Sequence, residues 1–223
     1  MDPSSSYTTL KLIAAFFFVA VNAFFVAAEF SIVKIRRSRL EEIEAHGNKR
    51  AKLAIKVTSA LDSYLSATQL GITLASLALG WIGEPALAVI IDPLFGPWLK
   101  DDPILMHSVS IATAFTLITL MHVVFGELVP KSIAIQKTET AVMWVVRPLY
   151  LFAQVFRPVI WIFDHLAACA LKIIGIHPAH ESDLVHSEEE IKLIAGASQR
   201  GGIIDKTESE IIKNAVDFSD KIA

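Results

Sequence analysis

Three long apolar stretches dominate the pattern of hydrophobic and polar positions along the chain. They cover about residues 10–33, 61–82 and 104–127. A helix crosses the hydrocarbon core of a bilayer with about 20 apolar residues, and each stretch is long enough for that. The pattern therefore predicts three membrane-spanning helices, which together form a transmembrane domain over residues 1–138.

Polar residues interrupt the second stretch at helical spacing. Ser66, Gln69, Thr73 and Ser76 recur every three or four residues, so they lie along one side of a helix. Lipid cannot satisfy hydroxyl and amide groups, and the stripe must therefore face protein or water. Two interpretations are open at this point: the stripe holds helices together, or it lines the path of a polar solute or cation.

The end of the third stretch carries a Gly-Glu-Leu-Val-Pro-Lys sequence, residues 126–131. Pro130 has no backbone N–H, which frees the carbonyl near Gly126. A carboxylate such as Glu127 beside free carbonyl oxygens is suitable chemistry for a hard cation. An ionisable group within a membrane is also a functional candidate by default. The alternative is a simple ion pair between Glu127 and Lys131.

Other polar residues lie inside the first and third stretches. Asn22 and Glu29 are two turns apart on the first helix, so they can share a face. Glu29 is expected either to attract ions or to pair with Lys34 or Arg36. His122, near the inner end of the third helix, is a weaker candidate for contact with an ion path.

The remaining chain divides into two predicted regions. Residues 139–176 are apolar but interrupted by Arg147, Arg157 and Asp164, so the pieces are shorter than a full span. This pattern favours amphipathic helices at the membrane surface over a fourth span. Residues 177–223 are predicted to form a small acidic helical bundle in the cytoplasm, leading to a further soluble domain.

Composition supports an integral membrane protein. Hydrophobic residues make up 53% of the 223-residue chain, and the mean hydropathy is +0.52. Lysine and arginine residues gather directly after the first helix, which predicts an outside N-terminus and a cytoplasmic C-terminus. The sequence holds neither a nucleophile–base pair nor a phosphate loop, so we expect no enzyme and no nucleic-acid partner.

Three separated motifs, at residues 22–30, 65–76 and 126–131, together with the acidic C-terminal segment, resemble one family. It is the CorC/HlyC branch of the CorC and cyclin M (CNNM) magnesium transporter family. The resemblance covers nearly the whole chain and implies an all-α membrane protein with three transmembrane helices, a belt of juxtamembrane helices and a helical bundle. In this family a pair of CBS domains that bind ATP with magnesium follows, and this chain stops before them.

The resemblance also implies a function and a site. It implies a homodimer in the plasma or inner membrane that exports Mg²⁺, coupled to Na⁺ by alternating access. The implied ligands are Asn22, Ser76, the Gly126 carbonyl and Glu127. Weaker candidates for the ion path are Glu29, Ser66, Gln69, Thr73, His122 and Pro130.

The family pattern has serine where Asn22 stands and asparagine where Ser76 stands, and both replacements still offer oxygen. The competing hypothesis is a dimeric membrane sensor or scaffold that regulates magnesium without transporting it. In that case the polar stripes only hold helices and protomers together.

Overall fold

The computed structural model describes residues 3–95, 102–175 and 188–219 of the chain. Every regular element within these ranges is a helix, which confirms the predicted all-α fold. The chain separates into two compact units, Met1–Ala167 and Ala168–Ala223. Each is described by itself below.

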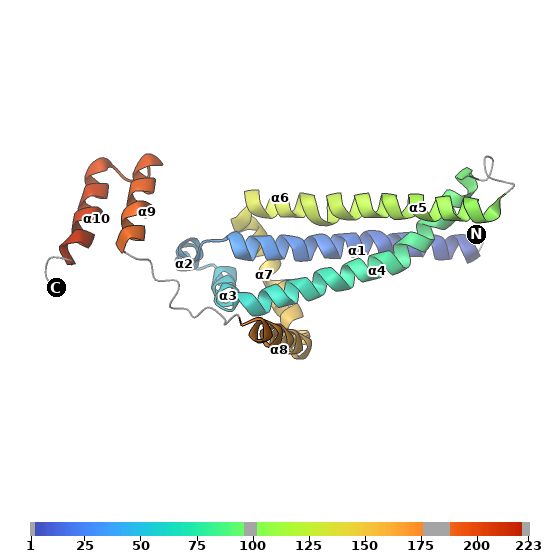
Figure 1. Cartoon of the computed structure of the whole chain (residues 1–223), viewed down its shortest axis with the longest axis horizontal. Helices are drawn as coiled ribbons and strands as arrows, with labels where there is room; N and C mark the ends of the chain where they lie inside the picture. The colour runs from blue at the N-terminus through green and yellow to red at the C-terminus, as the bar shows by residue number, and fades with distance from the viewer. Residues whose placement is uncertain (1–2, 96–101, 176–187, 220–223) are drawn as a thin grey trace. The chain divides into compact units, whose positions relative to one another are not determined.

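Two of the long helices are α1, Pro3–Lys34, and α4, Leu61–Phe95. The third consists of α5, Pro103–Met121, the π-helical turn η1, His122–Leu128, and α6, Val129–Gln136. The three lie lengthwise beside one another (Figure 1). Helix α1 packs against α4 and also against η1 and α6, while α5 packs against α4. The centre of this unit is therefore α1.

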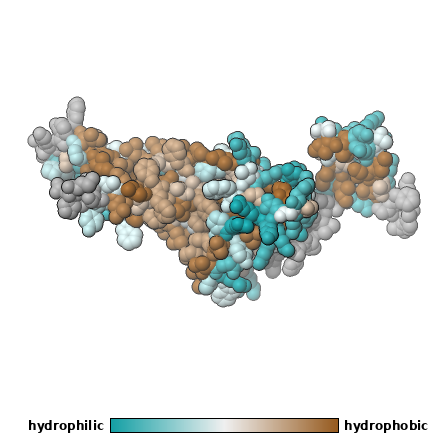
Figure 2. Space-filling model, turned by 180° about the vertical axis from the view of Figure 1, so that it is seen from behind, coloured by the Kyte–Doolittle hydropathy of each residue, from teal (hydrophilic) through white to brown (hydrophobic). Residues whose placement is uncertain are grey.

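All three long helices are long and apolar enough to cross a membrane, as predicted. Large apolar side chains cover their outer surfaces: Phe16, Trp81 and Phe115 are 62%, 85% and 59% exposed. Figure 2 shows this apolar surface in brown, with hydrophilic teal surface towards the short helices. An apolar surface of this extent suits a hydrocarbon solvent.

The second long helix extends further than predicted. Its expected end was residue 82, before Pro85, but α4 continues to Phe95 with Pro85 and Pro93 inside it. The turns after Pro85 bury Ala88 and Ile91 against Ala114 of α5. Proline is tolerated inside membrane helices when packing compensates for the lost backbone hydrogen bond, and this contact explains why the helix does not end at Pro85.

The third long helix also continues past its predicted end at residue 127. The chain widens into the π-helical turn His122–Leu128 and then resumes as α6 through Gln136. Such turns commonly occur at functional sites in helices. Here Pro130 lies in the first turn of α6, and its side chain is buried.

Two short helices follow α1. They are α2, Arg37–Ala45, and α3, Lys49–Thr58. Gly47 between them has a φ of +84°, which favours glycine. The side chain of Asn48 caps α3 by accepting a hydrogen bond from the Arg50 backbone N–H.

Helices α7, Thr138–Val155, and α8, Arg157–Ile174, meet at 82° instead of forming one straight helix. Helix α7 packs against α1 and α3. Its buried face belongs to the same core as Ile32, Leu40 and Val57, and it comprises Val142, Val145, Val146 and Leu149. Thus α7 connects the long helices to the short helices α2 and α3.

In the second unit, α9, Glu188–Arg200, packs against α10, Lys206–Ser219. A reciprocal capping box starts α10: the Glu208 N–H donates to Asp205, and the Asp205 N–H donates to Glu208, at 2.7 and 2.8 Å. Gly202, with a φ of +70°, lies in the connection between the helices.

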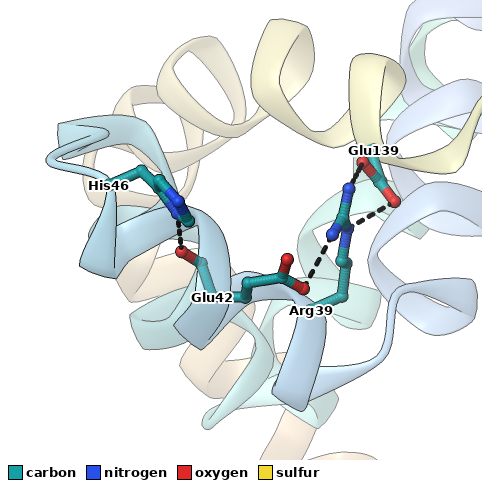
Figure 3. Close-up of polar contacts among 4 residues, drawn as sticks. All are labelled: Arg39, Glu42, His46 and Glu139. Atoms are coloured by element: carbon teal, nitrogen blue, oxygen red, sulfur yellow. Dashed lines mark hydrogen bonds and ion pairs between the residues drawn. The ribbon is translucent and has the colours of Figure 1, made fainter.

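An ion pair joins α2 to α7. Arg39 Nε donates to Glu139 at 2.8 Å, and Arg39 Nη1 donates to Glu42 at 2.7 Å (Figure 3). The hydrogen bond from Arg39 holds the pKa of Glu139 below its ordinary value of 4.5. A carboxylate whose pKa is lowered on folding stabilises the fold at pH values above its ordinary pKa. This stabilisation is lost as the pH falls through the folded-state pKa.

The first prediction concerns this pair. Because both side chains are exposed to solvent, we expect Glu139→Gln to lower the melting temperature only slightly at neutral pH. The difference from wild type should shrink as pH falls below the ordinary value of 4.5 and through the lowered pKa of Glu139, where the wild-type carboxylate becomes protonated. Melting curves of both proteins at several pH values test this prediction. As a control, Glu139→Gln should not change the melting temperature of a protein that already carries Arg39→Gln. A difference that grows on acidification would contradict this account.

Candidate functional site

Asn22 is the point at which the three long helices meet through polar contacts. Its side chain in α1 is fully buried. The Nδ2 group donates to the Gly126 carbonyl of η1 at 3.0 Å, and Oδ1 accepts from the Ser76 hydroxyl of α4 at 3.3 Å. A buried amide needs such partners, since leaving it unsatisfied is costly. One side chain thus links all three helices.

The Gly126 carbonyl is available to Asn22 because of Pro130. In a regular α-helix this carbonyl would accept a hydrogen bond from the N–H of residue 130, and proline has none. The sequence predicts a carbonyl without its helical partner near Gly126, and in this structure the Gly126 carbonyl accepts a hydrogen bond from the Asn22 amide.

Glycine at position 126 allows this close approach. A Cβ atom there would lie 2.9 Å from His122 Cδ2 and 3.1 Å from Asn22 Nδ2. Both separations are shorter than ordinary contacts, so a larger residue would push the Asn22 amide away. Gly126 therefore serves the site through both its carbonyl and its missing side chain.

His122 also belongs to this cluster. Its Nε2 lies 3.3 Å from the Ser76 hydroxyl oxygen. The one proton of that hydroxyl is directed to Asn22, so the geometry fits an Nε2–H tautomer in which the histidine donates to Ser76. The sequence placed His122 among the weaker candidates, and the structure brings it directly to Ser76.

Glu127 follows Gly126 in the π-helical turn and is half-buried. Within the described ranges no hydrogen bond or ion pair involves its carboxylate. The alternative pairing with Lys131 does not form, because the Lys131 amine lies over the Phe30 ring, 4.5 Å from its centroid. Glu127 thus directly follows a residue of the Asn22 cluster in the chain and has no partner among the described residues, and its role as a ligand remains a prediction.

Glu29 and Gln69 form a second polar contact between α1 and α4. Gln69 Nε2 donates to Glu29 Oε1 at 3.1 Å. This contact replaces the pairing of Glu29 with Lys34 or Arg36 that the sequence left open. The contact lies two helical turns from Asn22 along α1, on the side nearer α2.

The rest of the α4 stripe does not reach Asn22. Ser66 and Ser63 both donate to the carboxylate of Asp164 in α8. Thr73 donates to the backbone carbonyl of Gln69 in its own helix, at 2.7 Å. The four stripe residues therefore have separate hydrogen-bond partners.

A cavity of about 170 Å³ lies between α4 and α5, next to the Asn22 cluster. Ser76 and His122 contribute to its wall, and so does Glu84, two turns further along α4. The complete lining is Ser76, Leu79, Gly80, Glu84, Phe115, Ile118, Thr119 and His122. The polar cluster thus borders a space that an acidic side chain also reaches.

The site relies on neutral oxygens. Nowhere in residues 3–95, 102–175 or 188–219 do three histidine, cysteine, aspartate or glutamate side chains gather as metal ligands. Around Asn22 the available oxygens are an amide, a hydroxyl and a backbone carbonyl, with Glu127 as the adjacent carboxylate. Oxygen donors of this kind suit Mg²⁺ or Ca²⁺ better than zinc.

Comparison with known proteins identifies several relatives. The chain is 45% identical over 205 residues to the UPF0053 protein YhdT of Bacillus subtilis, and this alignment covers 92% of the chain and 44% of YhdT. It is 40% identical over 216 residues to the UPF0053 protein YrkA of the same organism, and this alignment covers 97% of the chain and 50% of YrkA. The UPF0053 protein sll0260 of Synechocystis is 32% identical over 222 residues, and this alignment covers 97% of the chain and 48% of sll0260. The chain spans about half the length of these relatives.

A family model also matches residues 13–208, which include most of α1, the two other long helices and the polar cluster at Asn22. That model describes the cyclin M transmembrane N-terminal domain. The match covers most of the chain and agrees with the resemblance carried by the three sequence motifs. The chain therefore belongs to the cyclin M transmembrane N-terminal domain (CNNM) family.

Proposed function

We propose that this chain is the transmembrane part of a divalent-cation transporter, most specifically one that exports Mg²⁺ in exchange for Na⁺. Family membership and the polar cluster between the long helices support this proposal. In it, the ion is cargo that binds between α1, α4 and η1, and the protein works as a homodimer in the cell membrane. The outside N-terminus and the cytoplasmic C-terminus are part of the same proposal.

The observation that carries the proposal is the meeting of three helices at Asn22. Asn22 Oδ1, Ser76 Oγ and the Gly126 carbonyl come from different helices within one set of hydrogen bonds. Glu127 adds the negative charge. Mg²⁺ prefers octahedral oxygen ligands and retains several waters, so a few protein oxygens and one carboxylate are sufficient to bind it.

The Asn22 hydrogen bonds suggest how an ion would change the helices. The Nδ2 amide group carries a partial positive charge and occupies the Gly126 carbonyl. A cation that uses this carbonyl must displace the amide, and Asn22 must then turn its Oδ1 towards the ion. In this proposal, ion binding replaces the direct hydrogen bond between α1 and η1 by contacts of both helices with the ion. The position of α1 relative to η1 then depends on whether the ion is bound.

Polar groups on both sides of the cluster fit a path through the unit. The cavity that Glu84 and Thr119 line lies on one side. The contact between Glu29 and Gln69 lies on the other. An ion leaving Asn22 in either direction would therefore meet an acidic side chain, which attracts cations.

The sensor or scaffold hypothesis also has an observation in its favour. Asn22, Ser76 and Gly126 satisfy one another directly, as polar groups do when they only hold membrane helices together. The two hypotheses differ in Glu127, which makes no hydrogen bond or ion pair with any other residue the structure describes. Helix packing does not need that carboxylate, whereas ion binding does.

The second prediction separates these hypotheses. We expect Glu127→Gln to lower Mg²⁺ flux by at least about tenfold, because losing the charged ligand costs more than about 1.4 kcal/mol of binding. The measurement is Mg²⁺ flux through liposomes that contain the full chain, with and without a Na⁺ gradient.

Glu42→Gln is the control, since that exposed acid on α2 lies outside the site. It should transport as the wild type does. Wild-type flux from a folded Glu127→Gln protein would favour the sensor or scaffold hypothesis over transport.

The third prediction uses two glycines of the membrane unit. Gly126→Ala places a methyl group against His122 and Asn22, so we expect weaker Mg²⁺ binding and a stability loss of about 1–3 kcal/mol. Gly80→Ala on α4 is the control for stability, because a Cβ there has no heavy atom within 4 Å, although Gly80 lines the neighbouring cavity. Calorimetry measures Mg²⁺ binding by Gly126→Ala, and thermal melting compares the stability of the two variants. Equal melting temperatures, with wild-type Mg²⁺ binding by Gly126→Ala, would show that close packing at Gly126 has no role in the site.

The fourth prediction concerns the contact between Asn22 and Ser76. We expect Asn22→Ser and Ser76→Asn each to weaken Mg²⁺ binding, because each single change alters the number of amide groups in the site. The double exchange restores one amide and one hydroxyl, so its affinity should return to within about threefold of wild type, a strongly non-additive result. Calorimetric titration of the four proteins tests this. Additive losses in the double variant would mean that the two side chains act independently.

A further inference from the structure

A second, larger cavity lies on the first unit, where α3, α4, α7 and α8 come together. Its volume is about 470 Å³. It is separate from the Asn22 cluster and shares no residue with the cavity beside His122. The lining residues that matter for its chemistry are Lys56, Tyr150, Gln154, Arg157, Trp161 and Asp164.

The polar groups in this cavity suit an anion. Lys56 and Arg157 supply two positive charges to its wall. The Lys56 amine lies 3.3 Å from the Tyr150 hydroxyl and 5.1 Å from the centre of its ring, which fixes the amine at the edge of the cavity. Arg157 makes no ion pair or side-chain hydrogen bond within the part of the chain that the structure describes.

The one acidic residue in the lining is already engaged. Both oxygens of the Asp164 carboxylate accept hydrogen bonds, from Ser66 and from Ser63. The lining therefore carries one more positive than negative charge, and Gln154 adds a neutral donor. This combination of an arginine, a lysine and neutral donors matches the way proteins bind phosphate groups.

The surroundings of the cavity point to lipid. Leu151, Val155 and Trp161 on α7 and α8 are 64%, 74% and 59% exposed, although all three are large and apolar. Tryptophan and tyrosine beside lysine and arginine are typical of the boundary between membrane and water. The 82° angle between α7 and α8 places the cavity at their junction, between cationic side chains and apolar helix faces.

We propose that this cavity binds the phosphate headgroup of an anionic glycerophospholipid. Arg157 and Lys56 contact the phosphate, and the acyl chains lie against the exposed apolar faces of α7 and α8. A soluble phosphate compound would use the same cationic groups but would leave these apolar faces unexplained. Because the cavity joins the start of α4 to the junction of α7 and α8, a bound lipid links the transmembrane helices to the juxtamembrane ones.

The test measures thermal stability of the purified full chain in nanodiscs. We expect phosphatidylglycerol to raise the melting temperature by several degrees relative to phosphatidylcholine, and inorganic phosphate added to phosphatidylcholine nanodiscs to leave it unchanged. Native mass spectrometry of the same protein should show retained phosphatidylglycerol. Arg157→Gln and Lys56→Gln should each reduce both the rise in melting temperature and the retention of phosphatidylglycerol.

Arg147→Gln is the matched control, since Arg147 also precedes a proline on these helices but does not line the cavity. It should respond to phosphatidylglycerol as the wild type does. If the Arg147 and Arg157 variants lose the stabilisation by phosphatidylglycerol equally, general attraction between the basic surface and anionic lipid explains it, and the proposal is wrong. Stabilisation by inorganic phosphate alone would identify a soluble-anion site and would overturn the assignment to lipid.

Discussion

The structure depends on one backbone carbonyl inside a membrane helix. Pro130 cannot supply the hydrogen bond that the Gly126 carbonyl would accept in a regular α-helix, and lipid cannot replace it. Asn22 does so from another helix, at 3.0 Å, and its other amide atom accepts from Ser76 on a third. The π-helical turn, the buried amide and the bare glycine are therefore parts of one arrangement that fixes α1, α4 and η1 together.

Within this arrangement the polar residues of α4 contact different helices. Ser76 contacts the cluster between the long helices, Gln69 contacts Glu29, and Ser66 contacts Asp164 of α8. The same helix thus touches the candidate ion site near its middle and α8 near its start.

The sequence predicted the parts of this structure that follow from hydropathy and from single residues. Three membrane helices follow from stretch lengths, and the free Gly126 carbonyl follows from Pro130 alone. Contacts that depend on helix rotation and packing were not predictable. Asp164 stood out only as an acid dividing an apolar run, and nothing local connects it to Ser63 and Ser66. The continuation of α4 past Pro85 likewise depends on Ala88 and Ile91 packing against α5, which is a long-range contact.

The central claim is that a cation binds where Asn22, Ser76 and Gly126 come together, with Glu127 as the charged ligand. A crystal structure of the full chain with Mn²⁺, a substitute for Mg²⁺ that scatters anomalously, tests it most directly. The account predicts an anomalous peak between α1, α4 and η1, with the Asn22 amide turned away from the Gly126 carbonyl. A Mn²⁺ peak elsewhere, with the hydrogen bond from Asn22 to Gly126 intact, would contradict it and would leave the cluster as a packing device between helices.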